Sequence, residues 1–243
     1  MKRGSLLFLC LLLLFGVLLP VFVTADEVTE NLESRILESF DPETRTTDWY
    51  VRGSKFITED YPKITYADAW PEALFGRNRD ENELQVLGVN AKFDRMGYNY
   101  LEFIPVKEGE DGELEANPIP IPGRAKQIDL WIWGSMYDYY MEVHISDYRG
   151  VVWVIHLGSI NYRGWRNLRA DIPHYIPQSE TYVPHRQGLA LEKLVLWTKP
   201  TERVADFYMY IDQIKILTDM FESRFDGDDL TWPEKMEEMW GEE

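Results

Sequence analysis

The chain has 243 residues, of which 42 are acidic and 25 are lysine or arginine, giving a formal net charge of −17 at pH 7. A surface this acidic repels the phosphates of nucleic acids and anionic membranes, which argues against nucleic acid as a partner. The nine Trp, fourteen Tyr and eleven Phe side chains favour half-buried positions in sheets and at protein interfaces.

The first 25 residues have the three-part layout of a secretory signal peptide. Lys2-Arg3 forms a basic start, Leu6 to Leu19 is almost unbroken apolar sequence, and Val23-Thr24-Ala25 supplies the residues expected before a cleavage site. The apolar run is shorter than the about 20 residues that a membrane-spanning helix needs, and Pro20 closes it. We therefore expect residues 1–25 to be cleaved on export, with no membrane insertion afterwards; an uncleaved membrane anchor is the alternative.

Cleavage at this site also removes Cys10, the only cysteine. The remaining 218 residues then hold no disulfide, and the loss of Lys2 and Arg3 takes the net charge from −17 to −19. A chain of this length buries a sufficient core without disulfides. We expect a folded domain over residues 26–225 and an acidic tail over residues 226–243.

Patterns along the chain predict mostly strands. Residues 28–40 place apolar side chains at a spacing that predicts a short leading helix. Strand signals follow at Val86–Phe93, Tyr98–Val106, Lys126–Trp133, Tyr139–Ser146, Val151–Leu157, Leu189–Thr198 and Asp206–Leu217. This series predicts an all-β fold, an antiparallel jelly-roll-like β-sandwich with short peripheral helices at the N- and C-termini. A division into two domains at residues 107–123, which are rich in Glu, Gly and Pro, is the alternative.

The C-terminus changes character after a turn at Asp226–Asp229. The segment Trp232–Glu243 is acidic and places Met236, Met239 and Trp240 at helical spacing. We expect a short amphipathic helix that either docks on the domain or binds a partner.

No motif of a known catalytic site is present. The sequence lacks HxH, HExxH, G-x-S-x-G, G-x-G-x-x-G and Walker patterns, so we predict no catalytic residues, no cofactor and no metal site. Strand alternation groups His144 with Tyr140 and Glu142 on one face and places His156 on the neighbouring strand of a hairpin. We interpret both as ordinary strand histidines. A glycosidase needs only two carboxylates, so the acidic composition alone leaves that class open.

Tryptophans mark a second predicted surface. In the strand that follows Lys126, Ile128, Leu130 and Ile132 share one face, whereas Trp131 and Trp133 share the other with polar residues. Two tryptophans beside polar residues predict a half-exposed flat surface. Such a surface is covered by the protein's own loops, contacts another protein, or stacks on a sugar ring.

The stretch from Ile128 to Ile176 carries an ordered set of short motifs: LWIWG at 130–134, DYRG at 147–150, LG at 157–158, YRGWR at 162–166 and IP at 172–173. In this order and spacing they resemble the FlaA family, the outer-layer or sheath proteins of spirochaete periplasmic flagellar filaments. The resemblance extends over most of the mature chain. The same stretch is also similar to β-jelly-roll carbohydrate-binding modules.

The resemblance implies a non-catalytic structural protein of the periplasm, without cofactors. Such a protein coats a core of FlaB-type flagellin beside other sheath subunits and adjusts filament shape or stiffness for motility. A periplasmic carbohydrate-binding protein of jelly-roll type is the alternative. Because Trp and Arg are typical interface anchors, we predict protein contacts at Trp131, Trp133, Arg163, Trp165 and Arg166, and in the tail at Trp232, Met236, Met239 and Trp240.

Overall fold

The computed structural model describes residues 30–77, 84–109, 111–179, 188–221, 230 and 233–241. Several sequence predictions lie outside these residues and stay predictions. They concern the signal peptide over 1–25, the turn at Asp226–Asp229, and Trp232.

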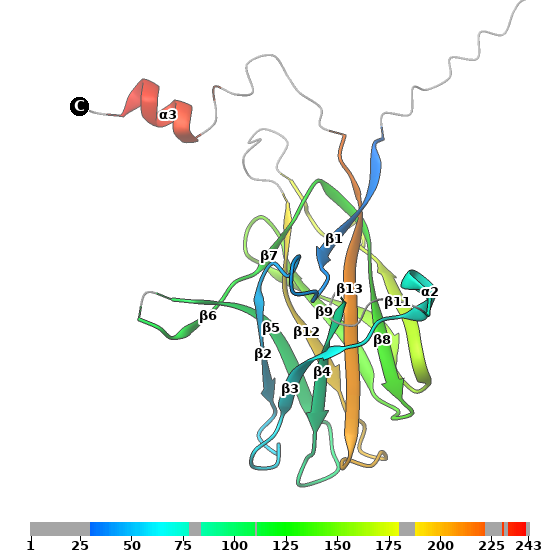
Figure 1. Cartoon of the computed structure of the whole chain (residues 1–243). Coiled ribbons are helices and arrows are strands. Elements are labelled where there is room, and N and C mark those ends of the chain that lie inside the picture. The colour runs from blue at the N-terminus through cyan, green and yellow to red at the C-terminus, as the bar shows by residue number, and fades with distance from the viewer. Residues whose placement is uncertain are drawn as a thin grey trace, which may run out of the picture.

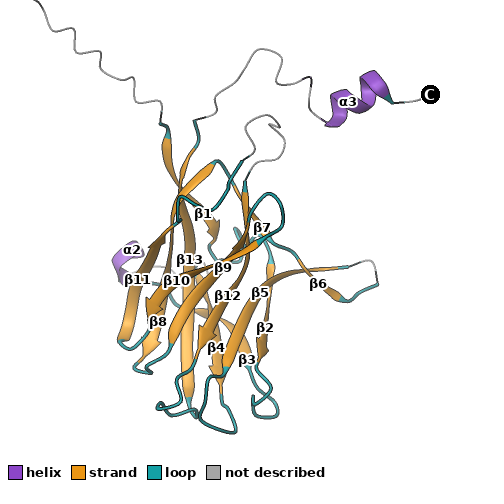
Figure 2. Cartoon of the chain, turned by 180° about the vertical axis from the view of Figure 1, so that it is seen from behind, coloured by secondary structure: helices purple, strands orange, loops and turns teal. Residues whose placement is uncertain are grey.

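The described residues form two antiparallel sheets that pack face to face as a sandwich (Figures 1 and 2). Sheet A has the strand order β11-β8-β13-β4-β3, and β1 also pairs with β13. Its strands are β1 (Leu32–Glu38), β3 (Lys63–Asp68), β4 (Gln85–Ala91), β8 (Arg124–Ser135), β11 (Arg163–Asp171) and β13 (Phe207–Asp219).

Sheet B has the strand order β10-β9-β12-β5-β2, with β6 beside β5 and β7 beside β12. Its strands are β2 (Asp48–Gly53), β5 (Tyr100–Glu108), β6 (Leu114–Ala116), β7 (Ile119–Ile121), β9 (Tyr140–Ser146), β10 (Val152–Ser159) and β12 (Leu189–Trp197). The chain crosses repeatedly between the sheets, from β1 to β2, from β8 to β9 and from β11 to β12. Such crossings are typical of jelly-roll-like sandwiches, so the predicted fold class is confirmed.

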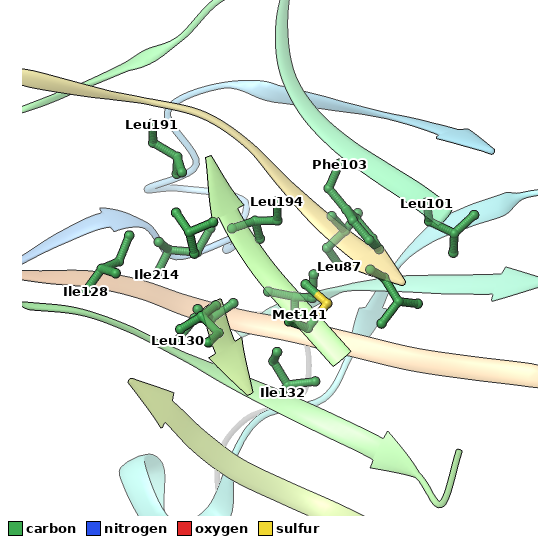
Figure 3. Packing of buried hydrophobic residues seen from close by; sticks show 14 of the residues in the cluster. Leu87, Leu101, Phe103, Ile128, Leu130, Ile132, Met141, Leu191, Leu194 and Ile214 are labelled. Atoms are coloured by element: carbon green, nitrogen blue, oxygen red, sulfur yellow. The ribbon is translucent and has the colours of Figure 1, made fainter. Parts of the chain in front are cut away.

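Alternation along the strands builds the core. On β8, Ile128, Leu130 and Ile132 are fully buried, and they pack among residues of β12 and β9 such as Leu194 and Met141 (Figure 3). Side chains of successive residues point to opposite faces of a strand, so the residues between them face outward. The predicted assignment of the two faces of this strand is confirmed.

The predicted N-terminal helix over residues 28–40 is wrong. Residues 32–38 form strand β1, which pairs antiparallel with β13 from Leu32 opposite Asp219 onward. Leu32 and Ile36, which suggested the helix, are exposed, whereas Leu37 enters the core. A helix this short is marginal without a buried face, and the backbone groups of β13 offer the segment a complete ladder of hydrogen bonds instead.

Among the described residues, two short helices lie outside the sheets, α2 (Glu72–Phe75) and α3 (Pro233–Trp240). Helix α2 lies between β3 and β4 in the chain (Figure 1). Helix α3 occupies the segment for which the sequence predicts an amphipathic helix. Neither helix has the length and apolar character that crossing a membrane requires, among the residues described.

The structure explains residues of two of the short motifs, DYRG at 147–150 and LWIWG at 130–134. In the turn between β9 and β10, the buried Asp147 side chain accepts hydrogen bonds from the backbone N–H groups of Arg149 and Val151 and from the indole of Trp153. Gly150 closes that turn with φ 78°, a left-handed conformation that favours glycine. At Gly134, a Cβ atom would lie 2.6 Å from a backbone oxygen of Tyr162, so only glycine fits there.

Candidate functional site

The outer face of sheet B presents polar and aromatic side chains together. On β9, Met141, Val143 and Ile145 are buried in the core. Tyr140, Glu142 and His144 alternate with them and are only partly buried on the opposite face. Their predicted grouping is confirmed. No helix of the described chain lies across this face (Figure 2).

Cross-strand register extends this face over the sheet. Trp197 of β12 lies between Tyr140 of β9 and Tyr100 of β5, which gives a row of three aromatic residues. The next row runs from His156 of β10 through Glu142 and Val195 to Glu102 and Arg52. We call this surface the sheet-B face, defined by Arg52, Tyr100, Glu102, Tyr140, Glu142, His144, His156, Lys193 and Trp197.

Glu102 is the electrostatic centre of the sheet-B face. Its Oε1 accepts a hydrogen bond from Lys193 Nζ at 2.6 Å, and its Oε2 accepts one from Arg52 Nε at 2.8 Å. Burial alone would raise the pKa of Glu102, but the hydrogen bonds and charges of Lys193 and Arg52 outweigh burial and lower it. Glu102 is therefore a fixed anion that holds two cations in place.

Glu142 orders the aromatic row. Its Oε2 accepts a hydrogen bond from Trp197 Nε1 at 2.8 Å, and His144 Nε2 lies 3.4 Å from the same oxygen. The Trp197 ring meets the ring of Tyr100 edge to face at 5.3 Å, and the Tyr140 ring lies 5.3 Å from His156. These contacts fix the orientation of the rings before any partner binds, which lowers the entropic cost of binding.

Glu102 and Glu142 flank Val195 from the two neighbouring strands, which places their backbones about 10 Å apart. Such a pair suggests a glycosidase, in which one carboxyl acts as a general acid with a raised pKa. The pKa of Glu102 is shifted the other way, downward. Glu102 is therefore unsuited to the role of that general acid. Among the described residues, no group of three or more His, Cys, Asp and Glu is placed to hold a metal ion.

The predicted contact residues of the domain lie on sheet A instead. Trp165 of β11 is directly opposite Trp133 of β8, and the Trp133 ring contacts Tyr210 of β13 edge to face at 5.6 Å. Trp131 and Arg163 lie on this same outer face. Arg166 does not, since it pairs with the core residue Ile132 and its guanidinium lies 4.6 Å from the centre of the Tyr162 ring.

Trp131 is partly buried on β8. Its Nε1 atom is buried and has no hydrogen-bond partner within the described residues, and the same is true of Oδ1 of the buried Asp212 opposite. In the tail, Met236, Met239 and Trp240 are exposed on α3, by 45%, 46% and 74% respectively.

Sequence reasoning missed most of the sheet-B face. Strands were predicted over 98–106 and 189–198, and alternation within them separates Tyr100 and Glu102, or Lys193 and Trp197, from the core positions. The signal missing from the sequence is the order of strands, which alone places Glu102 beside both Lys193 and Arg52.

Two comparisons of the sequence with known proteins both match flagellar filament outer layer proteins. Residues 31–226 match the model of the family described as FlaA, flagellar filament outer layer protein. The chain is also similar to a putative flagellar filament outer layer-like protein of Brachyspira hyodysenteriae, with 26% identity over 141 residues. That alignment covers 58% of this chain and 61% of the relative.

Similar solved structures include carbohydrate-binding modules. A module of the β-sandwich superfamily matches with a TM-score of 0.44 and 12% identity, over 75% of this chain and 60% of that one. The family 11 module of Lic26A-Cel5E from Clostridium thermocellum matches with a TM-score of 0.42 and 10% identity, over 80% of this chain and 99% of that one.

Proposed function

The chain belongs to the FlaA family of flagellar filament outer layer proteins, and from this membership we propose that it is a structural subunit of the periplasmic flagellar filament sheath. In this proposal, residues 1–25 direct export to the periplasm and are removed. The mature protein then coats a core of FlaB-type flagellin beside other sheath subunits. It acts without catalysis, by changing the shape or stiffness of the filament.

The observation that carries this proposal is the extent of the family match. Residues 31–226 include every strand of both sheets, from β1 to β13. The similarity therefore concerns the whole sandwich, including both outer faces and the turns that hold them.

The sheet-B face supports a contact role. It combines Trp, Tyr and Arg side chains, the residue types that most often anchor protein interfaces. Hydrogen bonds to Glu102 and Glu142 hold Arg52 and Trp197 in place. We propose that this face contacts the flagellin core. A single contact of this kind can be weak, because repetition along a filament makes attachment firm.

Labelling of purified periplasmic filaments with an antibody against the mature chain tests the main proposal. We expect label along the filament, and its absence would contradict the proposal. A pull-down on flagellin filaments tests the face. Trp197→Ala should reduce binding at least tenfold, whereas Tyr208→Ala, an exposed tyrosine of sheet A, should not. Circular dichroism of both variants controls for folding.

A carbohydrate-binding role is the second candidate, favoured by the row of Tyr140, Trp197 and Tyr100 on an open sheet face. Aromatic rings can stack on sugar rings, and Glu102, Glu142 and the cations beside them can bond to hydroxyl groups. Calorimetric titration with soluble oligosaccharides tests it. Heat of binding that Trp197→Ala abolishes supports this role. If neither the unchanged protein nor Trp131→Ala binds any sugar on a broad glycan array, the carbohydrate-binding role is excluded.

A further inference from the structure

Strand β10 is an outer strand of sheet B without a charged side chain. It is the first strand in the order of that sheet, so β9 pairs with one of its sides, and the described residues supply no strand for the other side. The free side of such an edge presents backbone N–H and C=O groups to any further strand. From Gly150 to Tyr162 the sequence has no Asp, Glu, Lys or Arg, and this is the longest such run after residue 25. An unpaired edge therefore coincides with the longest uncharged stretch of the mature chain.

The strands at the other three ends of the two sheet orders are charged. Sheet A ends at β11 and β3, and sheet B ends at β2. Each of these strands has basic and acidic residues, namely Arg169 and Asp171 on β11, Lys63 and Asp68 on β3, and Arg52 and Asp48 on β2. Charged side chains on an edge strand oppose pairing with another chain. Of these four strands, β10 is the one that lacks this protection.

The exposed face of β10 is apolar, and the regular part of the strand is short. Val152 and Val154 are 50% and 55% exposed and share the outer face with His156, whereas Ile155 is buried in the core. A bulge in the pairing with β9 between His156 and Gly158 interrupts the ladder, so the regular part covers residues 152–156. Because a bulge bends the edge and hinders pairing beyond it, a further strand fits along residues 152–156, with Val154 at the centre.

This stretch is complementary to a second copy of itself. In an antiparallel pair centred on Val154, that residue lies opposite Val154 of the other copy. Val152 then lies opposite His156, and Trp153 lies opposite Ile155. β-branched and aromatic side chains are favourable neighbours across strands, and no like charges meet in this register.

Charge also favours a second copy at this edge over a charged partner. The chain has a formal net charge of −17, so two copies repel each other over most of their surface. The turn at one end of β10 adds no net charge, because Asp147 and Arg149 form an ion pair at 2.9 Å. A strongly charged partner finds no countercharge on β10, whereas a second copy can approach there without repulsion between charges on the strand.

We propose that two copies of the chain pair along β10, antiparallel and about a two-fold axis at Val154, so that sheet B continues from one copy into the other. Residues paired across antiparallel strands share a face of the sheet, so both sheet-B faces point the same way. Each pair of copies then presents two such faces to one filament core, and a double contact attaches more firmly than a single one. This proposal deepens the proposed function and rests on it, because the sheet-B face is the contact surface proposed there.

A lysine at the centre of the edge tests the pairing, because in Val154→Lys two cations would meet at the two-fold axis. By analytical ultracentrifugation of the mature chain over a concentration series, we expect the unchanged protein to dimerise and Val154→Lys to weaken the dimer by about tenfold or more. The matched control is Ile64→Lys, at an exposed apolar residue of the outer strand β3, and it should dimerise like the unchanged protein. Circular dichroism of both variants controls for folding. A monomer at every concentration, or a dimer that Val154→Lys leaves unchanged, overturns the proposal.

A mixture of two charged variants gives the decisive result. Val154→Glu, like Val154→Lys, should dimerise weakly by itself, because like charges meet at the axis. An equimolar mixture of the two variants should form a one-to-one heterodimer, because a lysine then lies opposite a glutamate. A mixture that associates no more strongly than its components contradicts a contact in which this residue meets its own counterpart.

A single introduced cysteine checks the register. Without residues 1–25 the chain has no cysteine, so a thiol at one position links two copies only where that position meets itself. Opposite residues of an antiparallel pair have Cα atoms about 4.5–5.5 Å apart, which is within the range of a disulfide. With a mild thiol oxidant, Val154→Cys should form a covalent dimer and Ile64→Cys should not. A dimer in solution that Val154→Cys fails to link overturns the pairing centred on Val154.

Failure of the proposed function is visible separately, as absence of the protein from purified filaments. If filaments carry the protein but the unchanged chain is monomeric at every concentration, only the pairing along β10 is wrong.

Discussion

Asp212 of β13 lies directly opposite Trp131 of β8, and neither Asp212 Oδ1 nor Trp131 Nε1 has a hydrogen-bond partner in the part of the chain that the structure describes. Burial raises the pKa of Asp212 to about 8, and the carboxylate of Asp41 adds to the increase. The folded protein therefore holds this carboxyl protonated at neutral pH, at a cost in stability, since the unfolded chain ionises it near pH 3.9.

The first prediction concerns this buried carboxyl. Between about pH 4 and pH 8 the folded state binds a proton that the unfolded state has lost, so the contribution of Asp212 to stability falls as pH rises through that range. Asp212→Asn removes the titration and keeps the shape of the side chain. We expect the variant to be more stable at pH 7, by about 1–4 kcal/mol, and equal to the unchanged protein near pH 4. Urea unfolding at several pH values measures this.

Asp111→Asn, at an exposed aspartate, serves as the control and should leave the pH dependence of stability unchanged. A loss of stability in Asp212→Asn at pH 7 would show that the charged form of Asp212 is favoured, contrary to the expected direction.

The second prediction concerns the turn between β9 and β10. Burial alone would raise the pKa of Asp147, but hydrogen bonds from Arg149, Trp153 and two backbone N–H groups lower it. Asp147→Asn should cost about 1–3 kcal/mol at pH 7. Because the folded pKa is lowered, the contribution is present above about pH 4 and is lost as pH falls further, so the two proteins should converge in acid. Thermal unfolding at pH 7 and below pH 4 measures both values.

The matched control for Asp147→Asn is Asp171→Asn, at an exposed aspartate that accepts a hydrogen bond from Gln127. Its effect should stay within about 0.5 kcal/mol. Equal losses at the two positions would contradict a special role for Asp147.

The third prediction concerns close backbone packing at Gly134. A Cβ atom there would lie 2.7 Å from the carbonyl oxygen of Ile160 and 2.6 Å from that of Tyr162. Backbone atoms at such distances cannot move aside cheaply, so Gly134→Ala should destabilise the domain by about 3 kcal/mol. Gly97→Ala, where no atom lies within 4 Å of the added Cβ, should be nearly neutral. Similar melting temperatures for the two variants would refute this account.

The fourth prediction compares the two cations of Glu102. The Lys193 side chain is 27% exposed, whereas that of Arg52 is 57% exposed and better screened by water. Double-mutant cycles with Glu102→Gln should give a coupling of about 1–2 kcal/mol for Lys193→Met and below about 1 kcal/mol for Arg52→Met. The reverse order would mean that the bidentate geometry of arginine outweighs its exposure.

Much of the fold follows from local pattern. Alternation on the strand around Leu130 and on the strand around Val143 identifies the core face correctly, because burial of apolar side chains every second residue is a local property. The same logic places Trp133 and His144 on outer faces. The N-terminal segment is the instructive failure, since the spacing of Leu32 and Ile36 is compatible with a helix and only pairing with β13 makes it a strand.

The sequence by itself determined the acidic charge, the motifs shared with the FlaA family, the all-β class and the apolar face of the C-terminal helix, because each depends on residue type and short spacing. Only the tertiary structure decided which residues meet across strands. It placed Glu102 between Lys193 and Arg52, set Trp165 opposite Trp133 across two strands, and turned Arg166 away from both tryptophans. Strand order and register fix these neighbours, and they depend on the packing of the whole sandwich, which no short segment of the chain specifies.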